Sequence, residues 1–321
     1  MFVVAAATRG YPKEVVEKGV EMVLIVSTIV ITVFLVVVIF VMPPRKKKAL
    51  VDSSIEVAWE LVDKKTISHD TRRFRFALPS PKHILGLPVG QHISFIYTDA
   101  DGKLVTRPYT PTSSDADVGY VDFVIKVYFK NVHPKFPNGG KMSQHLESLN
   151  VGDKMTFSGP RGKITYVGNG AFHIALPKSK GGGYEKRRAK RVGMIAGGTG
   201  ITPMLQIMRH MFRTSGDNTE VSLLFANQSV DDILLRDEIE ADKSNNDQFK
   251  KLWYTVDRLP EDASSWKYDQ GFISEDMLKK SMPPPGPDTQ LLVCGPPPMI
   301  EYACKPAFAK LGYTDDMVLY W

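Results

Sequence analysis

Hydrophobic and polar positions divide this 321-residue chain into three regions. Residues 22–42 form one continuous apolar run without a charged side chain. From residue 55 onward, β-branched and aromatic stretches alternate with polar positions and are separated by turn signals, which predicts strands at 55–61, 72–77, 91–97, 120–128 and 154–157. From residue 191 onward, short apolar runs alternate with segments of helical periodicity.

The two larger regions predict two different domains. Several short strands with one helix, at 142–149, are typical of a small antiparallel β-barrel, which we place at 55–165. The third region predicts an α/β domain with a parallel sheet at 191–321, because strands and helices alternate there. We expect its strands at 191–196, 221–226, 249–256 and 290–294, and its helices at 203–212, 234–241, 274–280 and 298–311. Residues 166–190 then form an inter-domain linker.

The apolar run at 22–42 has the length of a membrane span. At about 1.5 Å per residue it forms a helix about 30 Å long, which matches the hydrocarbon core of a bilayer. A signal peptide has a shorter apolar core, and a buried helix rarely runs this far without a polar break. Two prolines and the basic run 45–48 follow, which places the carboxyl side in the cytosol. The sequence therefore predicts a non-cytosolic segment at 1–21, a transmembrane helix at 22–42 and a basic linker at 43–54.

Charge and cysteine content exclude several kinds of protein. The chain has only two cysteines and scattered histidines, so we expect neither a disulfide scaffold nor a metal site. The formal net charge is +6, but no nucleic-acid recognition motif accompanies it, so we expect no nucleic-acid partner. Many of the basic residues gather at 45–48 and 178–191. The second cluster is either a solvated loop or a docking patch for an acidic protein.

Two motifs in the barrel region suit a bound flavin nucleotide. The run Arg-Pro-Tyr-Thr-Pro-Thr-Ser-Ser at 107–114 combines a guanidinium, which can bond two pyrophosphate oxygens, with hydroxyls that can bond a flavin ring. It could also be an ordinary polar turn. The run Asn-Gly-Gly-Lys-Met-Ser-Gln at 138–144 opens a helix and offers free backbone N–H groups to an anion. Its alternative is a plain helix start with Ser143 near the cap.

Three features of the α/β region suit a dinucleotide. Gly-Gly-Thr-Gly-Ile-Thr-Pro at 197–203 follows a strand, and Thr202 can cap the helix that Pro203 begins. Cys294, in Cys-Gly-Pro-Pro-Pro-Met at 294–299, falls at the end of a strand, where it is either the wall of a ligand site or a buried thiol. Asp257 also ends a strand and can bond a ribose hydroxyl, which favours NADH over NADPH; an exposed turn aspartate is the alternative.

These motifs, in this order, resemble those of the NADH-cytochrome b5 reductases, within the ferredoxin–NADP reductase superfamily. The resemblance covers residues 51–311 and includes further matches at 124–130 and 270–272. It implies FAD bound across the barrel, NADH bound by the α/β domain, and transfer of single electrons to cytochrome b5, an acidic haem protein. It also implies that these electrons support lipid desaturation, lipid elongation and related haem-linked reactions.

The resemblance also implies roles for individual residues. Arg107 would hold the FAD pyrophosphate, with Pro108 beside it, and Tyr109 and Thr110 would contact the flavin. Thr110, Lys126 and Cys294 would lie at the reacting rings. The remaining FAD contacts would be Val124, Tyr128, Gly140, Lys141, Met142, Ser143 and Thr202, and NADH would be placed by Lys126, Gly198, Asp257, Phe272 and Cys294.

Two departures and two alternatives accompany the resemblance. The chain ends in Trp321, where members of the family often end in phenylalanine, and the basic segment 178–191 is divergent. A reductase of the same fold for another acceptor is one alternative, and a membrane-tethered nucleotide-binding protein without turnover is the other. An amino-terminal span of this kind serves the endoplasmic reticulum and the mitochondrial outer membrane alike.

Overall fold

The computed structural model describes residues 12–41, 46–132 and 136–321. The chain divides into two compact units, Met1–Lys46 and Lys47–Trp321. The expected segments 1–21 and 43–54 and the run 22–42 each lie partly outside the described residues.

Helix α2 (Lys13–Val41) contains the predicted apolar run as far as Val41. Its apolar side chains between Met22 and Phe34 are each more than half exposed. The hydroxyls of Thr28 and Thr32 donate to carbonyls one turn earlier, so the helix satisfies them internally. None of the helices formed by the described residues is long and apolar enough to cross a membrane. The expectation of a transmembrane helix is therefore not confirmed.

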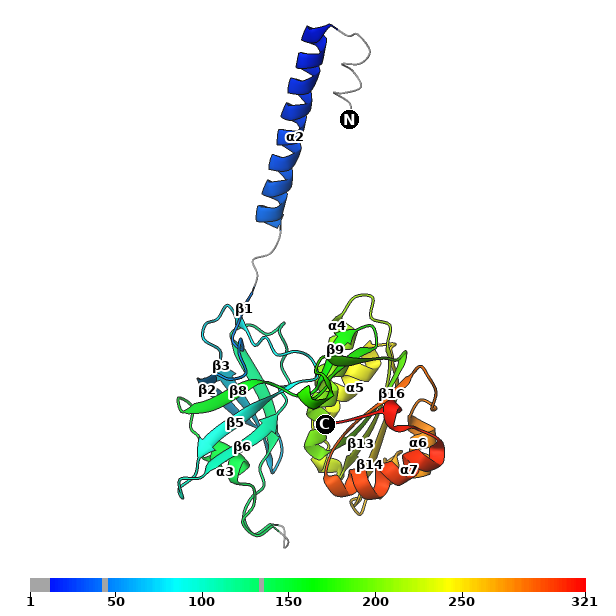
Figure 1. Cartoon of the computed structure of the whole chain (residues 1–321). Coiled ribbons are helices and arrows are strands. Elements are labelled where there is room, and N and C mark those ends of the chain that lie inside the picture. Colours follow the sequence, from blue (N-terminus) through cyan, green and yellow to red (C-terminus); the bar gives the residue numbers. More distant parts are fainter. Residues whose placement is uncertain (1–11, 42–45, 133–135) are drawn as a thin grey trace. The chain divides into compact units, whose positions relative to one another are not determined.

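A six-stranded antiparallel sheet forms the first half of the second unit, in the order β6-β5-β8-β2-β3-β7 (Figure 1). Its strands share one core, in which the ring of Phe95 lies 4.7 Å from Phe123 and 4.6 Å from Phe157, centroid to centroid. The predicted small antiparallel domain is confirmed as one sheet with a shared aromatic core, and β6 and β7 form its two edges. The strands are β2 (Glu56–Thr66), β3 (Thr71–Ala77), β5 (His92–Thr98), β6 (Leu104–Tyr109), β7 (Tyr120–Lys126) and β8 (Lys154–Arg161).

Three smaller elements complete this half. Helix α3 (Lys141–Ser148) buries Met142 and Leu146 in the aromatic core. Strand β1 (Lys47–Lys48) pairs with β4 (His83–Ile84). The segment expected as a linker, 166–190, instead carries most of a three-stranded sheet. Its strands are β9 (Ile164–Gly168), β10 (Ala171–Ala175) and β11 (Tyr184–Arg188), and a short 3₁₀ turn, η1 (Lys178–Lys180), lies between β10 and β11.

A second six-stranded sheet, entirely parallel, forms the α/β half, in the order β15-β14-β13-β12-β16-β17. Helices α4 and α5 cover one face of this sheet, and α6 and α7 cover the other (Figure 1). The predicted parallel sheet with helices on both faces is confirmed. The strands are β12 (Arg191–Gly197), β13 (Glu220–Asn227), β14 (Phe249–Val256), β15 (Asp269–Gln270), β16 (Thr289–Cys294) and β17 (Val318–Tyr320).

The helices of the α/β half begin and end close to their predicted positions. They are α4 (Ile201–Arg213), α5 (Arg236–Asn245), α6 (Glu275–Ser281) and α7 (Lys305–Leu311), with a π-helical turn η4 (Met299–Cys304) directly before α7 and short 3₁₀ turns η2 (Gly198–Gly200), η3 (Val230–Asp232) and η5 (Asp315–Met317). One detail of the prediction was wrong. Gly200, and not Thr202, is the N-cap of α4, and Thr202 lies inside the helix with its hydroxyl on the carbonyl of Thr199.

The strand order reverses between β12 and β16. The chain proceeds outward from β12 through β13 to β14 on one side, and returns to β16 on the other. Ligands of open α/β sheets bind at such a switch point, beyond the carboxyl ends of the strands. Here those ends carry Gly197 and Cys294, which places two of the predicted motifs side by side.

Candidate functional site

Strand β6 carries Arg107, Pro108 and Tyr109 at the free edge of the barrel sheet. An edge strand tolerates Pro108 because its missing N–H breaks no ladder bond. The Arg107 side chain is exposed, and its guanidinium donates to the neighbouring Thr106 carbonyl. It thus remains available to an anion along this edge. The ring of Tyr109 packs on Phe95 at 4.7 Å, and Thr110 behind it is buried.

The segment after β7 lies against the start of α3. The Gly140 N–H donates to the Tyr128 carbonyl at 2.8 Å, and the Tyr128 N–H donates to the Ser143 hydroxyl at 3.1 Å. Ser143 therefore joins the two segments and does not cap the helix. No side chain caps α3, so side chains leave the first backbone N–H groups of this eight-residue helix without a partner. The Lys141 ammonium points elsewhere, since it lies 2.6 Å from an Asp99 carboxylate oxygen.

Burial and a neighbouring phenol determine the protonation state of Tyr109 at this surface. Burial, and then the nearby Tyr128, raise the pKa of the Tyr109 phenol, which therefore stays protonated and can donate a hydrogen bond at neutral pH. Tyr128 itself is half exposed. An exposed guanidinium, an uncapped helix start and two tyrosines at one edge fit an aromatic dinucleotide with a pyrophosphate, such as FAD.

Val124 and Lys126 lie on the face of β7 opposite the aromatic core, because Phe123 and Ile125 face that core and side chains alternate along a strand. Strand β7 lies beside η2 of the α/β half. Val124 is buried there. The two residues expected at the flavin and at NADH thus stand where the two halves meet.

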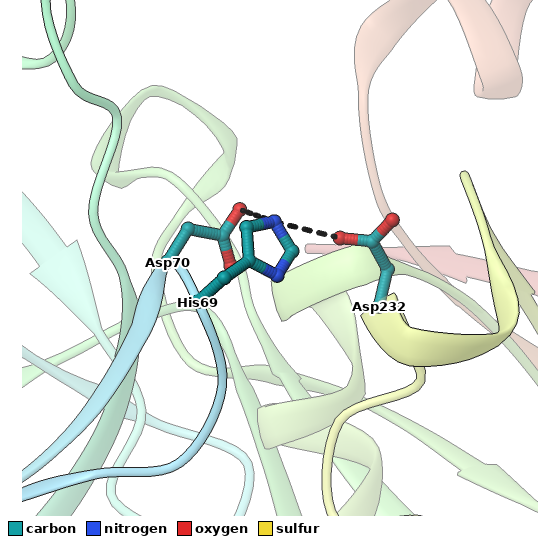
Figure 2. A group of neighbouring side chains, drawn as sticks. All are labelled: His69, Asp70 and Asp232. Atoms are coloured by element: carbon teal, nitrogen blue, oxygen red, sulfur yellow. Dashed lines mark ion pairs between the residues drawn. The ribbon is translucent and has the colours of Figure 1, made fainter.

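The Lys126 ammonium joins carboxylates from both halves. Its Nζ lies 2.6 Å from Asp70, in the turn between β2 and β3, and 3.1 Å from Asp232 in η3. His69 stands between the same two carboxylates (Figure 2). His69, Asp70 and Asp232 have the spacing of a metal site, but Lys126 already supplies a positive charge to both carboxylates. The arrangement is an ion-pair network across the junction of the halves.

The pKa values of this network follow from its geometry. Burial alone would lower the pKa of the Lys126 ammonium, but its hydrogen bonds to Asp70 and Asp232 outweigh burial and raise it. Burial would raise the pKa of Asp232, yet bonds from Ser229 and Lys126 bring it below its usual value. Both groups are therefore charged at neutral pH. A nicotinamide ring that approached Lys126 would therefore contact an ammonium group already paired with two carboxylates.

The glycine motif at 197–200 packs against the loop that follows β16. A Cβ atom on Gly200 would lie 2.2 Å from the Cys294 carbonyl oxygen, and one on Gly197 would lie 2.7 Å from the Met299 sulfur. These two glycines permit the two loops to touch. Gly198 has a φ of +53°, and a Cβ there would meet nothing within 4 Å, so this residue faces open space at the switch point. A pyrophosphate can approach the backbone closely there.

Cys294 lies in the wall of this site as a neutral thiol. It is partly buried at the end of β16, and burial raises its pKa to about 11. A thiol with this pKa is a poor nucleophile near neutral pH. A neutral, partly exposed thiol can contact a ligand but does not attack one.

Two other predicted residues lie at the rim of the α/β half. Asp257 is exposed directly after β14, and its backbone N–H bonds the Asn227 carbonyl. Phe272 is 80% exposed, so its ring packs on little of the described chain and is free to cover a ligand. Both stand at the carboxyl ends of the parallel strands, where a dinucleotide is expected.

Asn227 is a candidate that the sequence analysis missed. It ends β13, is only 8% exposed, and neither its amide nitrogen nor its amide oxygen has a hydrogen-bond partner within the described residues. An orphaned amide in this position costs free energy unless a ligand or water satisfies it. The signal in the sequence was a polar residue directly after a buried strand of a parallel sheet.

Comparisons with known proteins agree with this division. The model of the oxidoreductase FAD-binding domain family matches residues 58–166, and that of the oxidoreductase NAD-binding domain family matches residues 194–305. The protein is therefore an oxidoreductase with an FAD-binding and an NAD-binding domain, and FAD and NADH are its cofactors.

Individual relatives narrow the class. The chain is 54% identical to NADH-cytochrome b5 reductase 3 of Rattus norvegicus, over 83% of this chain and 87% of the relative. It is 52% identical to NADH-cytochrome b5 reductase 1 of Homo sapiens, over 85% and 88%. The crystal structure of the cytochrome b5 reductase domain of Ulva prolifera nitrate reductase superposes with a TM-score of 0.77 at 41% identity, covering 85% of this chain and 100% of that domain. This chain belongs to the NADH-cytochrome b5 reductase family.

Proposed function

We propose that this protein takes hydride from NADH and delivers single electrons to cytochrome b5 from a membrane surface, where reduced cytochrome b5 supports lipid desaturation, elongation and other haem-linked reactions. The observation that carries the proposal is the meeting of two complementary sites: β7 of the barrel half lies beside η2 of the α/β half. FAD, when bound, supplies the chemistry by accepting hydride at its ring and releasing electrons one at a time.

The residues of the chain would bind and orient the two ligands. Arg107 and the start of α3 would hold the FAD pyrophosphate, supported by the exposure of Arg107 and the uncapped helix. Tyr109, Thr110 and Val124 would line the flavin, and the thiol of Cys294 would form the wall of the nicotinamide site. The remaining proposed FAD contacts are Pro108, Lys126, Tyr128 and Thr202, and the backbone at the start of α3, at Gly140, Lys141, Met142 and Ser143.

Asp257 would select NADH over NADPH, because its carboxylate can accept a bond from a ribose hydroxyl and repels a phosphate in the same place. Gly198 and Phe272 would contact the same dinucleotide. We expect Asp257→Ala to reduce the preference for NADH by about 10-fold, or about 1.4 kcal/mol. The measurement is kcat/KM for both dinucleotides, with Asp288→Ala as the control, since Asp288 is paired to Lys190 at the opposite ends of the strands. An unchanged preference would remove Asp257 from this role.

The electron acceptor is tested directly by mixing. The NADH-reduced protein is mixed anaerobically with oxidised cytochrome b5, and the haem absorbance is followed in a stopped-flow instrument. Complete reduction of the haem within seconds is expected, with a rate that falls as salt is added, because the partners carry opposite charge. A flavin that is reduced by NADH but leaves the haem oxidised would favour another acceptor. A protein that is not reduced by NADH would favour the non-catalytic alternative.

Membrane attachment through 22–42 is the second part of the proposal. It is supported by the uncharged run and by the exposure of its apolar side chains in α2. The basic residues 45–48 would then lie on the cytosolic side, at the endoplasmic reticulum or the mitochondrial outer membrane. Flotation of the full chain with liposomes tests this. Val30→Lys and Val33→Lys each cost about 3 kcal/mol inside a bilayer, and together should abolish flotation. Val51→Lys and Val151→Lys, at exposed valines outside the run, should not. Flotation of both variants would contradict the anchor.

A further inference from the structure

The turn at residues 88–91 of the barrel half is held on several sides by the α/β half and its neighbouring sheet. From α4, Gln206 accepts a bond from the Gly90 N–H at 2.7 Å and donates to the Gln91 carbonyl at 3.2 Å. The indole N–H of Trp321 donates to the Gly90 carbonyl at 3.0 Å. Both backbone polar groups of Gly90 are therefore bonded to side chains of the α/β half.

Strand β9 also forms hydrogen bonds to this turn. The Tyr166 N–H donates to the Val89 carbonyl at 2.8 Å, and the Gln91 side chain donates to the Thr165 hydroxyl at 3.1 Å. Val89 itself packs against the core of the α/β half, as Trp321 does. Gly90 has a φ of +95°, and a Cβ on it would lie 2.9 Å from the Ile164 carbonyl oxygen. The turn thus has one fitted conformation between the two halves.

The groups that hold the turn belong to the elements that carry the dinucleotide loops. Gln206 lies in α4, which begins directly after the glycine turn η2. The backbone N–H of Trp321 donates to the carbonyl of Val293, one residue before Cys294. On the other side, residue 91 leads directly into β5, which pairs with the β6 strand that carries Arg107 and Tyr109. The turn therefore connects the strands that carry the proposed flavin site to the elements that carry the proposed dinucleotide site.

We propose that Trp321 and Gln206 are positioning residues that clamp the 88–91 turn and thereby set the alignment of the nicotinamide with the flavin. The proposal rests on the proposed function. Hydride transfer requires the two rings to be held about 3–3.5 Å apart, so a loosened junction lowers the fraction of aligned complexes without removing either ligand.

Two variants remove the clamp with little change of shape. Trp321→Phe removes the indole N–H and keeps an aromatic ring, and Gln206→Met keeps the length of the side chain and removes both of its bonds. Trp266→Phe is the matched control. Its indole N–H also donates to a backbone carbonyl, that of Asp269 at 3.1 Å, but both partners belong to the α/β half.

The variants are compared as full-length, FAD-loaded protein by two measurements. Stopped-flow reduction by NADH gives the limiting rate and the NADH concentration at half-saturation. Hydrogen exchange in the oxidised protein, read by mass spectrometry, gives the protection of the amides at 89–91. We expect the limiting rate to fall roughly 3- to 10-fold in Trp321→Phe and in Gln206→Met, as the loss of one or two hydrogen bonds allows. Half-saturation and flavin content should stay within about 2-fold, and exchange at 89–91 should increase. The Trp266→Phe protein should match the wild type in all of these.

The outcomes separate the proposals. Faster exchange with an unchanged limiting rate would overturn the positioning role, and unchanged exchange in both variants would overturn the clamp. A weaker apparent affinity for NADH with an unchanged limiting rate would make these residues part of dinucleotide binding and would also overturn the proposal. A wild-type protein that NADH does not reduce would refute the proposed function, while the exchange measurement would still decide whether the clamp holds the two halves.

Discussion

The two halves of the second unit build their ligand sites by opposite means. The barrel half presents side chains, with Arg107 and Tyr109 on an edge strand and Tyr128 beside an uncapped helix. The α/β half presents backbone, with Gly197 and Gly200 pressed against the loop after β16. Substitutions that shorten a side chain should therefore weaken ligand binding in the barrel half, and substitutions that add a Cβ atom to a glycine should disturb the site in the α/β half. Gly200→Ala and Arg107→Ala test this contrast directly. Asp232→Asn then tests the ion pairs that join the halves, and Cys294→Ser tests one side chain of the α/β half.

Gly200→Ala adds one carbon where the Cys294 carbonyl oxygen lies 2.2 Å from the new atom. The glycine loop and the loop after β16 must move apart, so we expect flavin reduction by NADH to slow by about 100-fold and the free energy of unfolding to fall by about 1–3 kcal/mol. Flavin content should change little, because most of the proposed FAD contacts lie in the barrel half. Gly286→Ala is the control, since it has no left-handed φ and a Cβ there would meet only the Arg191 guanidinium, at 3.9 Å. A Gly200→Ala protein with a wild-type rate would contradict the backbone character of this site.

Arg107→Ala removes atoms from the other half. A charge-assisted hydrogen bond contributes about 1.5–3 kcal/mol, so the affinity for FAD should fall roughly 10- to 100-fold. The ratio of flavin to protein after gel filtration measures this. Lys103→Ala, an exposed charge on the neighbouring turn, should retain its flavin. Full flavin content in Arg107→Ala would exclude Arg107 as the pyrophosphate ligand.

Asp232→Asn tests the network that joins the halves. It removes one of the two carboxylates on Lys126, so stability at pH 7 should fall by about 1–3 kcal/mol. The folded pKa of Asp232 is lowered, so its contribution is complete above its unfolded value of 3.8 and is lost as the pH falls through the folded value. The folded pKa of Lys126 is raised, so its contribution is lost only above about 10.5. Urea unfolding should therefore show a constant difference between pH 5 and 9 that shrinks below pH 4. A difference that grows in acid would contradict this sign.

Cys294→Ser has the smallest expected effect. The thiol has a pKa of about 11 and is neutral, so a neutral hydroxyl of similar size replaces it in the wall. We expect bound FAD to be retained and the rate of reduction by NADH to fall by about 2- to 5-fold, through altered contact with the ring. The pH profile of this rate between 7 and 9 should not change. Loss of the flavin would show that the residue is structural.

The sequence predicted the parts of the molecule that depend on local pattern. Buried apolar strands such as 191–196 and 221–226 appeared where expected, since a parallel sheet buried on both faces needs continuous apolar runs. The sheet of β9, β10 and β11 was missed because β11 is an exposed strand of charged residues without apolar alternation. Strand β17 was missed because its three residues are too few to show the alternation typical of a strand.

Site residues that belong to one continuous motif could be predicted from the sequence. Contacts between residues far apart in the sequence could not. The glycine run at 197–200 and the segment 107–110 were visible as motifs. The partners of Lys126, at positions 70 and 232, come from two separate segments, and only the fold brings them together. Gly90 and Trp321 lie 231 positions apart, so the hydrogen bond between them could not be read from spacing. The orphaned amide of Asn227 is a property of burial, which sequence does not state.

The most direct test of the account is the visible spectrum of the full chain before and after anaerobic addition of NADH. The account predicts a yellow protein whose flavin absorbance is lost within seconds on one equivalent of NADH, and far more slowly with NADPH. This result requires the barrel half to hold the flavin and the α/β half to bring the nicotinamide to it. A colourless protein that cannot be loaded with FAD, or a yellow protein that NADH leaves unchanged, would contradict the central claim that the two sites work on one another.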